Sequence, residues 1–188
     1  MKLVLLAAVL FQVCALRGEE SVYDAKHTEA ELPPGGEFIQ HPKKSEIRYY
    51  WSNRPGQNLA GLCTSLDAGK TWNLLCYIFT FRKVFVHPET GVLYAIIDYT
   101  WLKEDKGYLV RANANKLVMS EDGRRWKDIT RGRGYIADII DVFQDPEHPQ
   151  RVCMLTAVIR PTVFQASDDE YSKWTWYPAW EWEKRKHK

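Results

Sequence analysis

The side chains whose types and spacing could do chemistry are three acidic residues, each standing between a serine and a tryptophan. The first copy, residues 65–72, reads Ser-Leu-Asp-Ala-Gly-Lys-Thr-Trp. The second copy, residues 120–126, is one residue shorter and lacks the threonine, and the third, residues 167–174, lacks the glycine. A carboxylate can take part in acid–base chemistry, but it can also accept hydrogen bonds from the backbone N–H groups of a turn.

The other residues of the copies favour the second role. Glycine adopts a positive φ at no steric cost, serine can tie two strands together, and tryptophan buries a large aromatic surface. We therefore expect these residues to build rigid turns and assign them no catalytic role. The expected turn residues are Ser65, Asp67, Gly69, Thr71 and Trp72; Ser120, Asp122, Gly123 and Trp126; and Ser167, Asp169 and Trp174.

Other catalytic signatures are absent from the sequence. It contains no Gly-x-Ser-x-Gly, no His-Glu-x-x-His and no phosphate-binding loop. The five histidines are scattered, and His87 and His148 stand beside prolines in segments that read as turns. We expect no metal site and no cofactor.

The turns must be positioned by strands. From Ile47 onward, short runs of β-branched and aromatic residues alternate with turn residues, and no segment shows a sustained helical stripe. Residues 135–143 fit either a short helix or a buried strand. Residues 84–95 and 142–154 both read as strand, His-Pro or Asp-Pro turn, strand, and each is followed by a serine-to-tryptophan hairpin. A four-stranded unit of roughly 50 residues therefore recurs, which is the length of a propeller blade.

The eight residues from Ser65 to Trp72 resemble the Asp-box, or BNR repeat, of sialidase-like and sortilin-like β-propeller proteins. The resemblance covers residues 45–178 and implies an all-β fold of Asp-box four-stranded blades, a partial or small β-propeller of about three blades. Closed propellers have more blades, so we expect a truncated relative, an open stack, or closure with another copy. In this family the Asp-box lies on the blade periphery, away from the ligand site.

The resemblance also implies an alternative function, that of a sialidase-like glycoside hydrolase. That activity needs an arginine triad, a Tyr–Glu pair and a further acid, with an Arg-Ile-Pro signature ahead of the first Asp-box. The segment before Ser65 holds Arg48 and Arg54-Pro55 but no Arg-Ile-Pro, and the nearest similar string is Ile159-Arg160-Pro161. We expect a binding protein and not an enzyme, with a peptide, a protein or a glycan as the ligand. The alternative is a secreted structural protein that self-assembles as a homo-oligomer.

The first 15 residues read as a secretory signal peptide. Lys2 precedes an apolar run, residues 3–13, that is too short to span a bilayer. We expect cleavage after Ala15, with Gly18 as the alternative, and a secreted, extracellular protein. The domain boundaries that we expect are 1–15 for the signal peptide, 16–46 for a polar, partly disordered segment that could also add an outer strand, 47–182 for the Asp-box domain, and 183–188 for a basic tail.

Three cysteines remain after signal cleavage, an awkward number in an oxidising compartment. Cys63 and Cys76 lie on either side of one expected hairpin, so we expect them to form a disulfide. Cys153 is then either a buried thiol or an intermolecular thiol.

The formal net charge of +2 argues against nucleic acid as the main partner, and no later segment is apolar enough for a membrane span. Four tryptophans gather near the C-terminus, at positions 174, 176, 180 and 182. We expect Trp174 and Trp176 to share a buried strand face, and Trp180 and Trp182 to pack from a closing strand. The alternative is exposed rings that bind sugars or proteins.

Overall fold

The structure of the chain is a computed structural model. The signal peptide expected at residues 1–15 lies outside the described residues, as do the last three residues of the basic tail. For residues 99–114 only the backbone is described. The described residues are 25–53, 59–77, 79–105, 108–130, 138–157 and 160–185.

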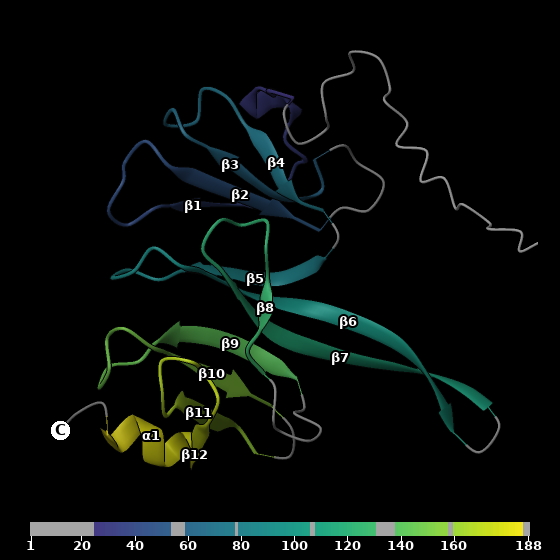
Figure 1. Cartoon of the computed structure of the whole chain (residues 1–188), viewed down its shortest axis with the longest axis vertical. Helices are drawn as coiled ribbons and strands as arrows, with labels where there is room; N and C mark the ends of the chain where they lie inside the picture. Colours follow the sequence, from purple (N-terminus) through teal and green to yellow (C-terminus); the bar gives the residue numbers. More distant parts are fainter. Residues whose placement is uncertain are drawn as a thin grey trace, which may run out of the picture.

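The fold consists of three four-stranded antiparallel sheets, each formed by four consecutive strands (Figure 1). The all-β prediction is thus confirmed. The described residues add one short 3-10 helix, η1 (Glu29–Glu31), and one α-helix, α1 (Ala179–Arg185). The strands are β1 (Glu37–Gln40), β2 (Arg48–Ser52), β3 (Gly61–Ser65) and β4 (Asn73–Cys76); β5 (Thr80–Val86), β6 (Leu93–Asp105), β7 (Tyr108–Ser120) and β8 (Lys127–Asp128); and β9 (Ile139–Gln144), β10 (Val152–Thr156), β11 (Thr162–Ala166) and β12 (Trp174–Pro178).

The second sheet lies between the first and the third (Figure 1). Strand β2 contacts β5, and β9 contacts β5, β6 and β7. Alternate residues of a strand face opposite sides of its sheet, so each sheet can pack on two neighbours. One apolar cluster joins the first two sheets through residues such as Trp51, Leu62, Phe81 and Ile97. A second cluster joins the last two sheets through Ile96, Leu117, Val142 and others. The described strands form no closed barrel.

The two outer faces of the stack are covered by segments of the same chain. On the first sheet, Tyr50, Cys63 and Trp72 pack against Leu32 of the N-terminal segment. The Tyr50 hydroxyl donates to the Pro33 carbonyl, and the Tyr50 oxygen accepts the Gly36 N–H at 2.9 Å. Because apolar sheet faces left in water favour association, such terminal caps are what a short stack of repeats needs.

Helix α1 covers the outer face of the third sheet. Trp182, which is 1% exposed, packs with Cys153 and Val163, whereas Trp180 on the same helix is 64% exposed. The expected closing strand at this point is wrong. The alternating Trp-Glu-Trp-Glu pattern suggested a strand, but alanine, glutamate, lysine and arginine are strong helix formers and the buried indole fixes the helix on the sheet. Trp174 is buried as expected, but Trp176 is exposed on the edge strand β12.

Two ambiguous segments are now assigned. Residues 139–144 form strand β9. Residues 139–143 of the segment that fitted either a helix or a strand are therefore in a strand. The outer-strand alternative for the N-terminal segment also holds, because β1 pairs antiparallel with β2. The sheet region therefore begins at Glu37, earlier than the boundary expected at residue 47.

Strands β6 and β7 are longer than their neighbours. Pairing of β5 with β6 ends at Asp98, whereas β6 and β7 continue to pair up to Asp105 and Tyr108. The two strands therefore leave the stack as a two-stranded ribbon (Figure 1). Among the residues described, no helix combines the length and the apolar character needed to cross a membrane.

The expected disulfide between Cys63 and Cys76 is not formed. Cys63 lies opposite Leu74 and Cys76 lies opposite Leu62, on either side of a register shift. The two thiols consequently point to different faces of the first sheet, since Cys63 packs with Trp72 and Cys76 belongs to the cluster shared with the second sheet. Burial raises the pKa of the Cys63 thiol to about 12, which keeps it protonated and unreactive.

Cys153 is fully buried beneath α1, which matches the alternative of a buried thiol. A bond from its sulfur to another chain would require the helix to leave the sheet. The structure therefore gives no support to the intermolecular thiol.

We predict that Trp182→Ala destabilises the fold by about 3–5 kcal/mol, because it leaves a large cavity beneath α1. The matched control, Trp180→Ala on the same helix, should change the unfolding free energy by less than about 0.5 kcal/mol. Urea denaturation of both variants measures the difference. Equal losses in the two variants would contradict the cap assigned to α1.

Candidate functional site

The first serine-to-tryptophan turn, residues 65–72, joins β3 to β4 and is held together by its own polar side chains. The Asp67 carboxylate accepts the Thr71 N–H at 2.8 Å and the Thr71 hydroxyl at 2.7 Å. The Ser65 hydroxyl donates to Asp67 at 2.8 Å and accepts the Gly69 N–H at 2.8 Å. Gly69 has a φ of 97°, and Trp72 donates its indole N–H to the Gly69 carbonyl at 3.1 Å. Hydrogen bonds from Thr71 and Ser65 lower the pKa of Asp67 to about 2, so this carboxylate stays ionised. Its oxygens are engaged by the hydrogen bonds of the turn.

The second turn, between β7 and β8, has the same pattern of hydrogen bonds. The Ser120 hydroxyl donates to Asp122 at 3.1 Å and accepts the Gly123 N–H at 2.9 Å. Asp122 accepts the backbone N–H groups of residues 124–125 at 2.9 and 2.8 Å, and these bonds lower its pKa. Trp126 donates to the Gly123 carbonyl at 3.0 Å. The predicted residues of the first two turns are therefore brought together in one geometry.

The third turn, between β11 and β12, differs from the prediction in its acid. Asp168, not Asp169, accepts the Ser172 N–H at 2.8 Å and the Ser172 hydroxyl at 2.5 Å. Asp169 is exposed and pairs with Arg151 at 2.6 Å. The signal that identifies Asp168 is its spacing of four residues from a hydroxyl residue, as in the first turn. Ser167 also differs, since its hydroxyl bonds to the Thr175 hydroxyl at 3.0 Å and not to the acid.

The place of the missing glycine in the third turn is taken by Tyr171. It stands three residues before Trp174, as Gly69 and Gly123 stand before their tryptophans, and its φ is 57°. Its buried hydroxyl lies 2.6 Å from the hydroxyl of Tyr94 on the second sheet. A tyrosine with a left-handed φ is strained, and here it fills the space between two sheets.

A second repeated turn joins the first two strands of each sheet, and sequence analysis found only two of its three copies. His87 Nδ1 accepts the N–H groups of the second and third residues after it, at 3.2 and 3.3 Å. Asp145 accepts the corresponding N–H groups at 2.8 and 3.2 Å. His41 Nδ1 accepts the Lys43 N–H at 3.1 Å. A proline follows each accepting residue, so the His41-Pro42 dipeptide was the signal for the third copy.

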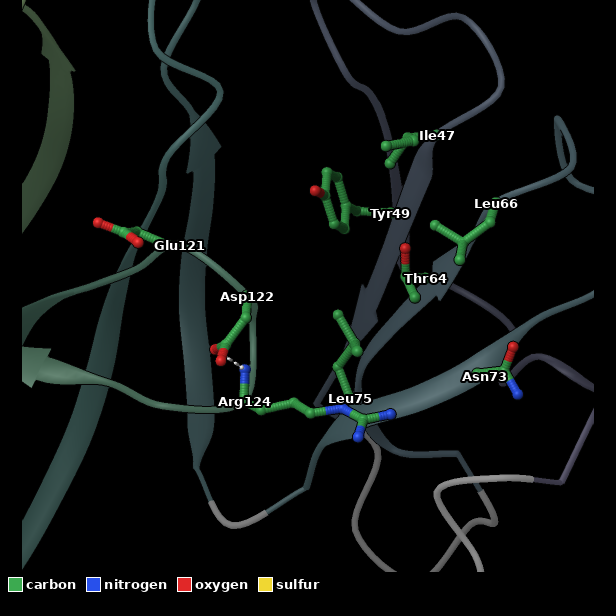
Figure 2. A pocket seen from close by; sticks show the side chains of 9 residues that line it. All are labelled: Ile47, Tyr49, Thr64, Leu66, Asn73, Leu75, Glu121, Asp122 and Arg124. Atoms are coloured by element: carbon green, nitrogen blue, oxygen red, sulfur yellow. Dashed lines mark hydrogen bonds between the residues drawn. The ribbon is translucent and has the colours of Figure 1, made fainter.

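A pocket of about 360 Å³ lies between the first sheet and the second serine-to-tryptophan turn, residues 120–126 (Figure 2). We call this space the first wedge, and the space around Tyr171 between the second and third sheets the second wedge. The inner face of the first sheet supplies apolar and small polar side chains, and the turn supplies charged ones. The lining residues are Ile47, Tyr49, Thr64, Leu66, Asn73, Leu75, Glu121, Asp122 and Arg124.

The second and third turns meet their neighbouring sheets in different ways at the equivalent position. A Cβ at Gly123 would lie 2.5 Å from Leu75 Cδ1, so Leu75 of the first sheet packs directly on the backbone of the second turn, beside the pocket. At the same position of the third turn, Tyr171 crosses to Tyr94 and closes the second wedge. The first wedge holds a pocket lined by both apolar and charged groups, which is the composition of a binding site.

Two arginines that could contribute to a sialidase-like arginine triad make contacts elsewhere. Arg82 pairs with Asp98 at 2.6 Å, and Arg48 donates to Gln40 at 3.2 Å. Within the part of the chain that is described, no three His, Cys, Asp or Glu side chains gather as metal ligands. No protein-family model matches this chain, and no curated protein sequence is significantly similar to it.

We predict that Asp168→Ala lowers the melting temperature by about 3 °C, the size of effect expected from losing a side chain that caps backbone N–H groups. Asp169→Ala removes only an exposed ion pair and should shift it by less than about 1 °C. Differential scanning calorimetry compares them. A larger effect for Asp169→Ala would restore the original assignment of the third turn.

We also predict an acid-sensitive stability that depends on His87. Burial lowers the pKa of His87, so the unfolded chain takes up a proton near its ordinary pKa of about 6.5 while the folded chain stays neutral. The contribution of neutral His87 to the free energy of unfolding is complete above a pH of about 6.5. It is lost as the pH falls through the lower pKa of the folded state. His87→Asn keeps an acceptor for the turn N–H groups and removes the titration.

Urea denaturation at about pH 7, 6 and 5 tests this expectation. Wild type should lose stability on acidification, and the variant should lose less. A remaining slope is expected from His41, whose pKa is also lowered by burial. Identical slopes for wild type and variant would contradict the role of His87.

Proposed function

We propose that this chain is a non-catalytic binding module built from Asp-box repeats, with each four-stranded sheet corresponding to one propeller-type blade. The support is positional, because all three turns join the third and fourth strands of their own sheets. The acids Asp67, Asp122 and Asp168 are occupied by turn hydrogen bonds, so they serve the scaffold. On the basis of the apolar N-terminal run, we propose that the protein acts outside the cell.

The observation that carries the binding function is the contrast between the two wedges. The sheets repeat the same architecture, yet the second wedge is filled by Tyr171 and the first is left open. We propose that the first wedge holds the ligand. Leu66 is 65% exposed beside it, and a large apolar side chain kept in water at the rim of a pocket is typical of an interaction site.

A peptide segment of a protein suits this pocket better than a glycan. Three aliphatic side chains, Ile47, Leu66 and Leu75, line it. Binding an apolar side chain against an aliphatic surface is favourable because both are removed from water. Sugar sites instead rely on flat aromatic faces and dense polar groups. The lining residue with an aromatic ring, Tyr49, is itself buried in the core cluster.

The test is selection of a displayed random-peptide library on the folded protein, followed by affinity measurement on the enriched peptides. We expect Leu66→Ser to weaken their binding by about tenfold, the loss expected when an apolar side chain no longer covers the ligand. The matched control is Ile140→Ser, an exposed aliphatic residue on β9 of the third sheet.

Two outcomes would overturn the proposal. The first is that no peptide is enriched while a glycan array gives a defined hit. The second is that the enriched peptides bind Leu66→Ser as tightly as they bind the control, which would place their site elsewhere.

A further inference from the structure

Arg124 is the charged group at the first wedge that is available to a ligand. Its backbone N–H is used by Asp122, but its guanidinium has no ion pair or hydrogen bond among the described residues. Other arginines of the fold are engaged, since Arg125, Arg151 and Arg185 each pair with a carboxylate. Arg124 is exposed, so its charge is not required for packing.

The two acids beside Arg124 do not compete for its charge. The Asp122 carboxylate accepts hydrogen bonds from Ser120, from the backbone of residues 124–125 and from the Arg125 side chain at 2.9 Å. Glu121 points away from the other lining side chains (Figure 2). The negative charge of the turn is therefore either compensated or directed elsewhere.

The position of Arg124 places its charge next to an apolar surface. Figure 2 shows its side chain running past Leu75 toward Asn73, along the lower border of the pocket. A guanidinium presents a planar fork that matches a carboxylate in a bidentate pair, and its methylene stem can lie on apolar neighbours. The pocket thus offers an anion-binding group and an aliphatic wall side by side.

We propose that the first wedge recognises an acidic side chain, Asp or Glu, that stands close to an aliphatic residue in an extended peptide, with Arg124 binding the carboxylate. This inference rests on the proposed binding function. Because the pocket is open to solvent and not enclosed, a chain can enter and leave it, which favours a side-chain carboxylate over a chain terminus.

The experiment uses the same displayed library on wild type and on Arg124→Gln, with Arg160→Gln as the matched control at an exposed arginine in the connection between β10 and β11. Arg124→Gln keeps the backbone N–H that Asp122 accepts, so the turn is retained. Wild type and control should enrich Asp or Glu next to an aliphatic residue. Arg124→Gln should lose the acid but keep the aliphatic residue, and it should bind the wild-type peptides about tenfold more weakly.

Synthetic peptides then separate the sources of the carboxylate and the ways of failing. The expected ligand is the amidated peptide that keeps its acidic side chain; a peptide that needs only a free C-terminus would contradict the inference. Arg124→Glu should reverse the preference to basic side chains. If peptides bind through Leu66 but Arg124→Gln changes neither selection nor affinity, this inference fails while the binding function stands. If no peptide is enriched at all, both fail.

Discussion

The fold depends on one interaction, an aspartate carboxylate that accepts the backbone N–H groups of the turn between the third and fourth strands of a sheet. Unsatisfied N–H groups at a partly buried turn are costly, and a carboxylate satisfies two or more of them at once. Asp122 accepts two backbone N–H groups, and Asp67 and Asp168 each accept one backbone N–H group and the hydroxyl of the same residue. Each turn thereby fixes the fourth strand and sets a tryptophan against its sheet, which makes the sheets similar enough to stack.

The same repetition leaves room for one difference, and that difference is where function is proposed. The residue three positions before each tryptophan has a positive φ in every turn. In the second turn Leu75 packs on the backbone of Gly123 with the pocket beside this contact, whereas in the third turn Tyr171 reaches across the second wedge to Tyr94. The same position of the repeat thus makes a different contact with the neighbouring sheet in each wedge.

Much of this was predictable from the sequence, because it depends on local patterns. The alternation of apolar residues predicts the strands and the burial of Trp174. The Ser-x-Asp spacing predicts two of the three turns. The third acid was missed because one extra residue separates Ser172 from the tryptophan. The prediction of a Cys63–Cys76 disulfide was wrong because strand register decides which face a side chain occupies, and a register shift is not visible in the sequence. Helix α1 was missed because docking of Trp182 overrode an alternating pattern, and the pocket depends on packing between sheets.

The most direct test of the central claim is a map of amide chemical-shift changes as an enriched peptide is titrated into the labelled protein. We expect the changes to cluster on the inner face of the first sheet and on residues 121–124, while the amides around Tyr171 stay unchanged. Changes that cluster on the third sheet or around the second wedge, with the first wedge unaffected, would contradict it.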